Sequence, residues 1–252
     1  MSGAAQDPLL LVHGFAQTPQ SWQTVIEVMG KNRVLHAIEL PGHGATALTR
    51  GEPTVKSARQ AVLDEIAGLR TEHVAIWGYS QGARVALDAV LHNPENCSAL
   101  ILESGTAGID DPLARADRRS RDVALGSRIA AGSIEDFVGL WERVPALGDQ
   151  SAELIEQQRP DRLAHDPVAL GAALQGIGQA AYDPMWNRLN EIEIPVLLIS
   201  GERDRVYTRH ARHMAEAITN AKHVVVPDAG HCVHLERPAE AVTAVEGFLN
   251  SA

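Results

Sequence analysis

The chain has few aromatic residues, two cysteines and no long apolar run, and each scarcity excludes a class of protein. No apolar stretch approaches the roughly 18 residues of a membrane-spanning helix. The first residues, Met-Ser-Gly-Ala-Ala-Gln-Asp, lack the basic region and apolar stretch of a secretory signal. Cys97 and Cys232 have neither metal-binding nor redox spacing. We therefore expect a soluble cytoplasmic protein with free thiols, no metal and no membrane insertion.

Basic residues are also a minority. The formal net charge is −10 over 252 residues, which disfavours nucleic acids and anionic membranes as partners. Hydrophobic residues make up 45% of the chain, which is enough for one substantial core. Against this acidic background, any cluster of arginines needs an explanation.

What the sequence does contain is an alternation of short apolar runs and helix-like segments. Continuous apolar runs are typical of strands that are buried on both faces of a parallel sheet. The alternation predicts an α/β fold with a doubly wound, mostly parallel sheet of about six strands. The predicted strands are 8–13, 33–39, 73–77, 99–103, 194–200 and 222–227, and the predicted helices between and after them are 20–30, 54–70, 81–92, 206–219 and 238–249.

The interval from residue 108 to residue 188 breaks this alternation. It has no convincing strand, and four of its segments have helical character. An all-helical block inserted after one strand is most simply a cap over the edge where ligands bind, the carboxyl ends of the strands. We therefore predict a core of residues 1–107 and 189–252 and a helical cap of residues 108–188. The predicted cap helices are 111–126, 133–142, 152–165 and 167–180.

Residues 78–82, Gly-Tyr-Ser-Gln-Gly, form a Gly-x-Ser-x-Gly motif between a predicted strand and a predicted helix. This context is that of a nucleophile elbow, a sharp turn that raises a serine above the sheet edge. Glycines on either side leave room for the strained turn and for close packing of the helix. The bare pattern is common, so Ser80 as a catalytic residue depends on its partners.

A serine becomes a nucleophile or a base when a histidine takes its proton and a carboxylate orients that histidine. Asp204 and His231 each follow one of the last two predicted strands, at the same sheet edge as Ser80. The chain order Ser, Asp, His is the one expected for this fold. We therefore predict a triad of these three residues. Glu202 is an alternative acid and His234 an alternative base, and Asp204 could instead cap the helix that follows it.

An oxyanion hole needs backbone N–H groups from the residue after the nucleophile and from the loop after the first strand. These residues are Gln81 and Phe15. His13-Gly14 gives that loop a close backbone approach. We expect His43, in Pro-Gly-His-Gly, to be structural.

With these residues in place, the chain resembles an α/β-hydrolase-fold protein over nearly its whole length. One departure is the start, where seven residues leave no room for the two antiparallel edge strands that such proteins usually have. The resemblance therefore implies a shortened member of the family. It rests on the motifs at residues 13–15, 40–44, 78–82, 201–204 and 230–231.

Within that superfamily the chain most resembles the 2-succinyl-6-hydroxy-2,4-cyclohexadiene-1-carboxylate synthases of menaquinone biosynthesis (MenH type). The motifs are Gly-Tyr-Ser-Gln-Gly-Ala-Arg-Val at 78–85, Leu-Glu-Ser-Gly at 102–105 with arginines after it, and a tryptophan shortly before Pro145. The resemblance implies a substrate site lined by a tyrosine before the serine, an arginine after it, and a tryptophan and two arginines of the cap. Carried over to this sequence, these are Tyr79, Arg84, Arg118, Trp141 and Arg162, with Arg159 as the alternative to the last.

The resemblance also implies a lyase. It would eliminate pyruvate from 2-succinyl-5-enolpyruvyl-6-hydroxy-3-cyclohexene-1-carboxylate, with the Ser-His-Asp triad as general base and without a metal or organic cofactor. About three guanidinium groups suit such a small-molecule polycarboxylate, because arginine binds carboxylates with two parallel hydrogen bonds. A serine hydrolase of a carboxylate-bearing substrate and a non-catalytic hydrolase-fold binding protein are the alternatives. We expect a monomer or a small homo-oligomer.

Overall fold

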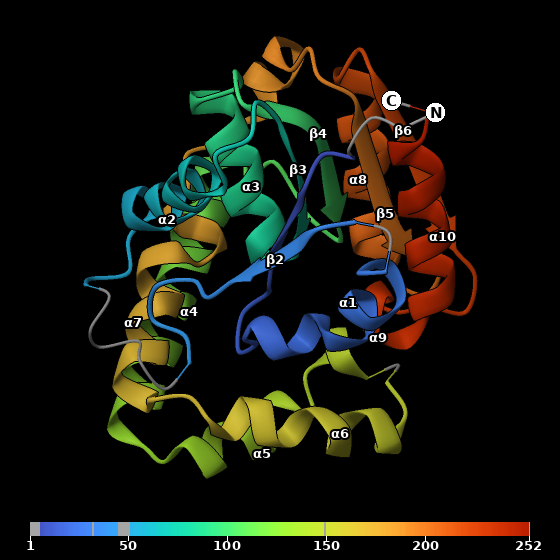
Figure 1. The fold of residues 1–252 in the computed structure, drawn as a ribbon. Coiled ribbons are helices and arrows are strands. Elements are labelled where there is room, and N and C mark those ends of the chain that lie inside the picture. Colours follow the sequence, from blue (N-terminus) through green and yellow to red (C-terminus); the bar gives the residue numbers. More distant parts are fainter. Residues whose placement is uncertain (1–5, 32, 45–50, 149, 252) are drawn as a thin grey trace.

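The fold is built on one parallel sheet. The computed structural model describes residues 6–31, 33–44, 51–148 and 150–251. In this part of the chain six strands form an all-parallel sheet in the order β2-β1-β3-β4-β5-β6 (Figure 1). The six predicted strands are therefore confirmed. They are β1 (Leu9–Val12), β2 (Leu35–Ile38), β3 (Val74–Tyr79), β4 (Cys97–Glu103), β5 (Val196–Gly201) and β6 (Ala221–Val226).

Helices cover both faces of this sheet, as Figure 1 shows. One face packs against α2, α3 and α8, and the other against α1, α9 and α10. The chain runs outward from β1 to β2 and then returns to β3 on the other side of β1. This reversal places the loops after β1 and β3 side by side, where ligands bind in such sheets. The helices are α1 (Gln23–Met29), α2 (Val55–Leu69), α3 (Gln81–His92), α8 (Arg205–Ala217), α9 (Val233–Glu236) and α10 (Pro238–Leu249).

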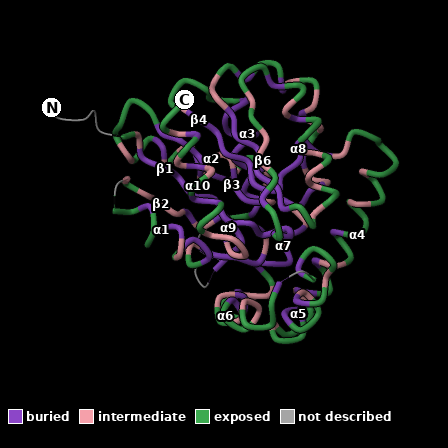
Figure 2. The backbone as a smooth tube through the Cα atoms, turned by 90° about the vertical axis from the view of Figure 1, so that its right-hand side faces the viewer, coloured by how far each residue is buried: buried purple, intermediate pink, exposed green. Residues whose placement is uncertain are grey.

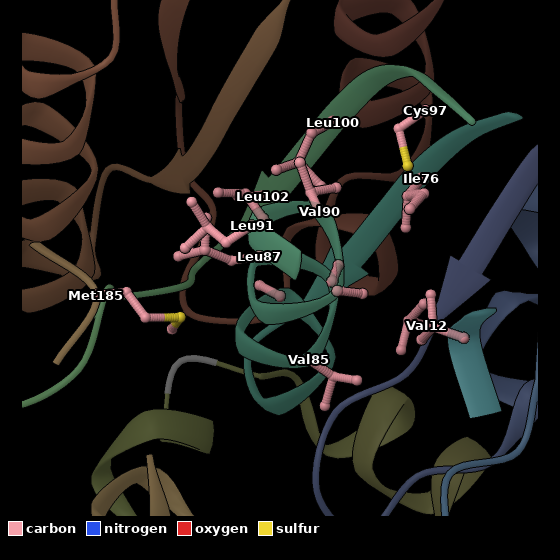
Figure 3. Packing of buried hydrophobic residues seen from close by; sticks show 14 of the residues in the cluster. Val12, Ile76, Val85, Leu87, Val90, Leu91, Cys97, Leu100, Leu102 and Met185 are labelled. Carbon is pink, nitrogen blue, oxygen red and sulfur yellow. The ribbon is translucent and has the colours of Figure 1, made fainter. Parts of the chain in front are cut away.

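Strand alternation divides the core into two clusters. Successive strand residues point to opposite faces, so Leu10 and Ile76 pack against α3, while Leu11 and Trp77 pack on the opposite face. Figure 3 shows the first cluster, in which side chains of β1, β3 and β4 gather beside α3. Figure 2 shows the buried residues concentrated in the sheet and on the sides of the helices that face it. The helix that follows Ser80 is therefore held in place along most of its length.

A block of helices separates β4 from β5 in the chain. The helices α5 and α6 lie beyond the carboxyl ends of the strands (Figure 1). The described part of the block contains no strand. Its α-helices are α4 (Pro112–Ala131), α5 (Ile134–Trp141), α6 (Ala152–Leu163) and α7 (Pro167–Ile177), and its 3-10 helices are η3 (Pro145–Leu147), η4 (Gln179–Ala181) and η5 (Trp186–Glu191).

Two predicted helix ends in this block were wrong. The last helix was expected to end at residue 180, but α7 ends at Ile177. The first helix was expected to end at Gly126, but α4 continues to Ala131. Gly126 instead allows a close crossing with α7, because a Cβ there would lie 2.5 Å from the carbonyl oxygen of Gly171. Beyond Gly126, Ile129 is 3% exposed, so the burial of its side chain stabilises the last turns of α4. This glycine serves packing between helices rather than termination.

None of the described helices is both long and apolar enough to cross a membrane. Cys97 and Cys232 are both buried and both free, as the sequence predicts. Cys97 lies in β4 against α3 (Figure 3).

Candidate active site

Ser80 occupies a strained turn between β3 and α3. Its φ of 51° and ψ of −103° are unfavourable for a residue with a side chain. A Cβ at Gly82 would lie 2.1 Å from the carbonyl oxygen of Val12, and one at Gly78 would lie 2.5 Å from that of Gly82. Both glycines of the motif are therefore required by close backbone contacts. The Ser80 N–H donates to the carbonyl of Glu103 at 2.8 Å, which ties the turn to β4.

The structure brings Ser80, His231 and Asp204 together. The distance from Ser80 Oγ to His231 Nε2 is 2.9 Å, and that from His231 Nδ1 to Asp204 Oδ2 is 2.6 Å. Both distances lie within the range for proton transfer. The His231 and Asp204 side chains are 8% and 11% exposed, so little water competes for these hydrogen bonds.

The alternative residues lie elsewhere. Asp204 does cap α8, but with its other oxygen, since Oδ1 accepts from the N–H of Tyr207 at 3.1 Å. Glu202 is exposed and accepts from the N–H of Asp228. His234 is completely buried and paired with Glu103. The geometry therefore favours Asp204 and His231 over both alternatives.

The two predicted oxyanion-hole residues flank the serine. Gln81 is the first residue of α3, where the backbone N–H has no partner within the helix. Phe15 lies in the turn after β1, and its ring packs edge-on against Trp141 at 5.2 Å between centroids. A Cβ at Gly14 would lie 2.6 Å from Tyr79 Cε1, so only glycine allows this approach. Their role as oxyanion donors stays a prediction.

His43 lies in a row of buried histidines beside this turn. Its ring centroid is 5.0 Å from that of His13 and 5.7 Å from that of His165. Burial lowers the pKa of His13 to about 3 and that of His43 well below its usual value. Burial also lowers the pKa of His165, which lies in the turn after α6. Its Nδ1 accepts from the N–H of Gly44, so a neutral imidazole joins this turn to the loop after β2.

Arg84 is a buried cation without a counter-ion. It lies one turn after Ser80 in α3 and is 5% exposed. Its Nε has no hydrogen-bond partner, and no carboxylate of the described chain lies in ion-pair range. Burial lowers the pKa of its guanidinium. An unpaired buried charge is strongly unfavourable unless a ligand neutralises it.

Arg118 and Trp141 approach the same region from the helical block. Arg118 Nε donates to Asp122 Oδ1 at 2.8 Å, and its Nη1 donates to Gln179 Oε1 at 2.6 Å. The positive charge of Arg118 lowers the pKa of Arg84, and the negative charge of Asp122 raises it. Asp122 pairs with Arg118 and not with Arg84, which leaves a net positive charge near Ser80. Trp141 also stacks on Phe137, with 5.7 Å between centroids.

The other two predicted substrate-binding residues have different surroundings. Tyr79 is 4% exposed, and its ring lies 5.4 Å from the ring of His231. Arg162 is 2% exposed and bonded to Glu142, Gln150 and Gln158. Contact of Arg162 with a substrate stays a prediction and would require the Glu142 pair to open.

Arg159, the alternative to Arg162, also binds Glu142 but is 41% exposed. The two arginines thus share one carboxylate of α5's carboxyl end.

Two residues near the triad were not found from the sequence. The Tyr207 ring lies 4.5 Å from the ring of His231, and its backbone N–H donates to Asp204 Oδ1 at 3.1 Å. Its only signal in the sequence is its position three residues after Asp204. The other residue is Glu103, a carboxylate at the end of a buried strand, which the apolar run before it made conspicuous.

Glu103 and His234 form a buried pair behind the triad, and this pair should make stability depend on pH. Burial alone would lower the pKa of His234, but Cys232 and Glu103 beside it raise the pKa from 6.5 to about 10. Because the folded state holds the His234 proton more tightly than the unfolded state, the protonated pair contributes its full stability below pH 6.5. This contribution is lost as the pH rises to about 10. We expect the free energy of unfolding to decline between these limits, and His234→Asn to remove that decline. Denaturant unfolding across this pH range checks it, and parallel curves for the two proteins would contradict it.

The fold and the geometry together define a class of protein. A parallel sheet that carries a strained serine elbow, with a histidine and an aspartate on later loops of the same edge, is the arrangement of the α/β hydrolases. The model of the alpha/beta hydrolase family matches residues 9–245, and the chain belongs to this family.

Its relatives narrow the comparison. The chain is 34% identical to a Bacillus subtilis (strain 168) protein provisionally named as a 2-succinyl-6-hydroxy-2,4-cyclohexadiene-1-carboxylate synthase, over 98% of this chain and 92% of that protein. It is 28% identical to the synthase of that name from Salmonella paratyphi C, over 96% and 93%. The solved structure of MenH from S. aureus superposes with a TM-score of 0.93 at 29% identity, over 99% of this chain and 96% of that one.

Proposed function

We propose that the protein eliminates pyruvate from 2-succinyl-5-enolpyruvyl-6-hydroxy-3-cyclohexene-1-carboxylate, giving 2-succinyl-6-hydroxy-2,4-cyclohexadiene-1-carboxylate for menaquinone biosynthesis. It is a lyase on a hydrolase fold, in line with the names of its relatives. The observation that carries the proposal is Arg84, a buried and unpaired guanidinium one turn from Ser80. A neutral ester would leave this charge without a partner, whereas a polycarboxylate supplies one.

The names of substrate and product define the bonds that change. The ring double bond at position 3 becomes a diene at positions 2 and 4, so a proton leaves C2 and the bond from C5 to the enolpyruvyl oxygen breaks. The released enolpyruvate takes up a proton and becomes pyruvate. No electrons are exchanged with a second reactant, and water is not consumed. The reaction therefore needs a base for C2, stabilisation of the charge that develops and binding of three carboxylates.

The triad supplies the base. Asp204 holds the Nδ1–H of His231, and His231 Nε2 takes the hydroxyl proton of Ser80, whose oxygen then removes the C2 proton. Negative charge develops on the succinyl carbonyl oxygen next to C2. The N–H groups of Phe15 and Gln81 are the donors that we assign to this oxygen.

The remaining predicted residues would bind the carboxylates and the ring. Arg84 and Arg118 offer guanidinium groups near the serine, and Trp141 offers an apolar face beside Phe15. Tyr79 would line the site beside His231, whose ring lies 5.4 Å from its own. We assign residues 108–188 as the cap over this site and the cytoplasm as the location. We expect a monomer or a small homo-oligomer.

The direct test supplies the enolpyruvyl substrate to the purified protein. Pyruvate, measured with a coupled dehydrogenase, should appear in equal amounts with the cyclohexadiene, measured by its absorbance. Release of no pyruvate above background, together with fast hydrolysis of aryl esters, would overturn the proposal.

A serine hydrolase is the second candidate, because the hydrogen bond of 2.9 Å between Ser80 and His231 also suits acyl transfer. An esterase from Thermogutta terrifontis shares the fold, with a TM-score of 0.84 at 24% identity. A hydrolase would release a burst of alcohol from an activated ester and leave an acyl group on Ser80. Absence of both, with pyruvate released from the enolpyruvyl substrate, separates the two functions.

A further inference from the structure

Glu103 contacts the turn that carries Ser80 and the segment that carries His231. Its backbone carbonyl accepts from the N–H of Ser80 at 2.8 Å. Its carboxylate accepts from the backbone N–H of His234 at 3.0 Å and from Nδ1–H of the same residue at 2.8 Å. The second carboxylate oxygen accepts from Trp77 Nε1 at 3.1 Å. One fully buried residue at the end of β4 therefore joins the serine turn to the segment that carries His231.

That segment, residues 227–236, is short and is held at several points. His234 lies three residues after His231, is 0% exposed and stacks on Trp22 at 4.1 Å between centroids. The carboxylate of Glu236 accepts from the N–H groups of Gly230 and Cys232, on either side of His231. The position of the His231 ring therefore depends on contacts that lie behind it, away from the substrate.

The negative charge of Glu103 is balanced by His234, so this cluster needs no external ion. Glu103, Cys232 and His234 offer ligand atoms within 4.8 Å of one another, as a metal site would. However, one oxygen of Glu103 already accepts two hydrogen bonds from His234 and the other accepts one from Trp77. A cation would have to displace these bonds. The cluster is therefore better described as a buried ion pair.

We propose that Glu103 is a positioning residue for the reaction. Through its carbonyl it fixes Ser80, and through its carboxylate and His234 it fixes the segment that carries His231, so that it sets the distance between Oγ and Nε2. This rests on the proposed triad but not on the identity of the substrate. Displacement of a catalytic group by about 1 Å can lower a rate by about a hundredfold.

The test is Glu103→Gln, which keeps the shape but leaves a single accepting oxygen for three donors. We expect kcat for pyruvate release to fall about tenfold to a hundredfold. KM should change less than about twofold, because the guanidinium groups assigned to the carboxylates belong to α3 and α4. The rate at which a fluorophosphonate labels Ser80 should fall by the same factor as kcat. Labelling needs no natural substrate, so it separates failure of this proposal from failure of the proposed function.

His234→Asn is the second variant, in case Glu103→Gln does not fold. If both residues act through one connection, the double variant should be no slower than the slower single variant. Asp88→Asn is the matched control, since Asp88 is another buried carboxylate. It lies in α3 and pairs with Arg59 of α2 at 3.1 Å. This variant should reduce stability without changing labelling. Rates are compared well below the unfolding midpoint of each variant. Labelling and kcat at wild-type values in folded Glu103→Gln or His234→Asn would overturn the proposal.

Discussion

Ser80→Ala is expected to lower kcat for pyruvate release by about 10²- to 10⁴-fold, the contribution of a well-placed general base. The variant removes the atom that lies 2.9 Å from His231 Nε2, while the arginines that would bind the substrate remain. The dissociation constant of the substrate should therefore change little. Steady-state kinetics give the first quantity, and calorimetric titration of the inactive variant gives the second.

Ser21→Ala is a suitable control for that experiment. Ser21 lies in η1 (Pro19–Trp22) and is also buried, but its hydroxyl donates to the carbonyl of Thr18. It should leave kcat unchanged. Normal turnover in Ser80→Ala would exclude the triad as the base, whereas lost turnover with retained binding would exclude a purely binding role for the protein.

Arg84→Met is expected to lower kcat/KM at least a hundredfold and yet to stabilise the protein. The rate falls because the guanidinium that orients a carboxylate near Ser80 is lost. Stability should rise by about 1 kcal/mol or more, because methionine fills similar space without an unpaired buried charge. Pyruvate-release kinetics and denaturant unfolding measure the two effects on the same preparation.

Arg59→Met is the matched control for this combination of lower activity and higher stability. Arg59 pairs with Asp88, which is 6% exposed, so its removal takes away the main counter-ion of a buried carboxylate and leaves it His92 at 3.4 Å. This variant should be destabilised and should keep its activity. If Arg84→Met is instead destabilised with a near-normal rate, Arg84 has a structural role, and the main support for a polycarboxylate substrate is lost.

Much of the fold could be predicted because its signals are local. Strands buried on both faces leave continuous apolar runs, and the runs at 194–200 and 99–103 lie within two residues of β5 and β4. The end of α4 was predicted wrongly at Gly126. A glycine that ends a helix and one that allows two helices to cross are the same letter in a sequence, and only the position of Gly171 distinguishes them.

The sequence by itself determined the order of strands and helices, the serine elbow and the chain order of Ser80, Asp204 and His231. These follow from hydrophobic periodicity and from glycines that a tight turn requires. The tertiary structure decided which charges have partners. It left Arg84 unpaired, bonded Arg162 to Glu142 and joined Glu103 to His234 across 131 positions. Such pairing depends on where distant helices and strands pack, and no local pattern records it.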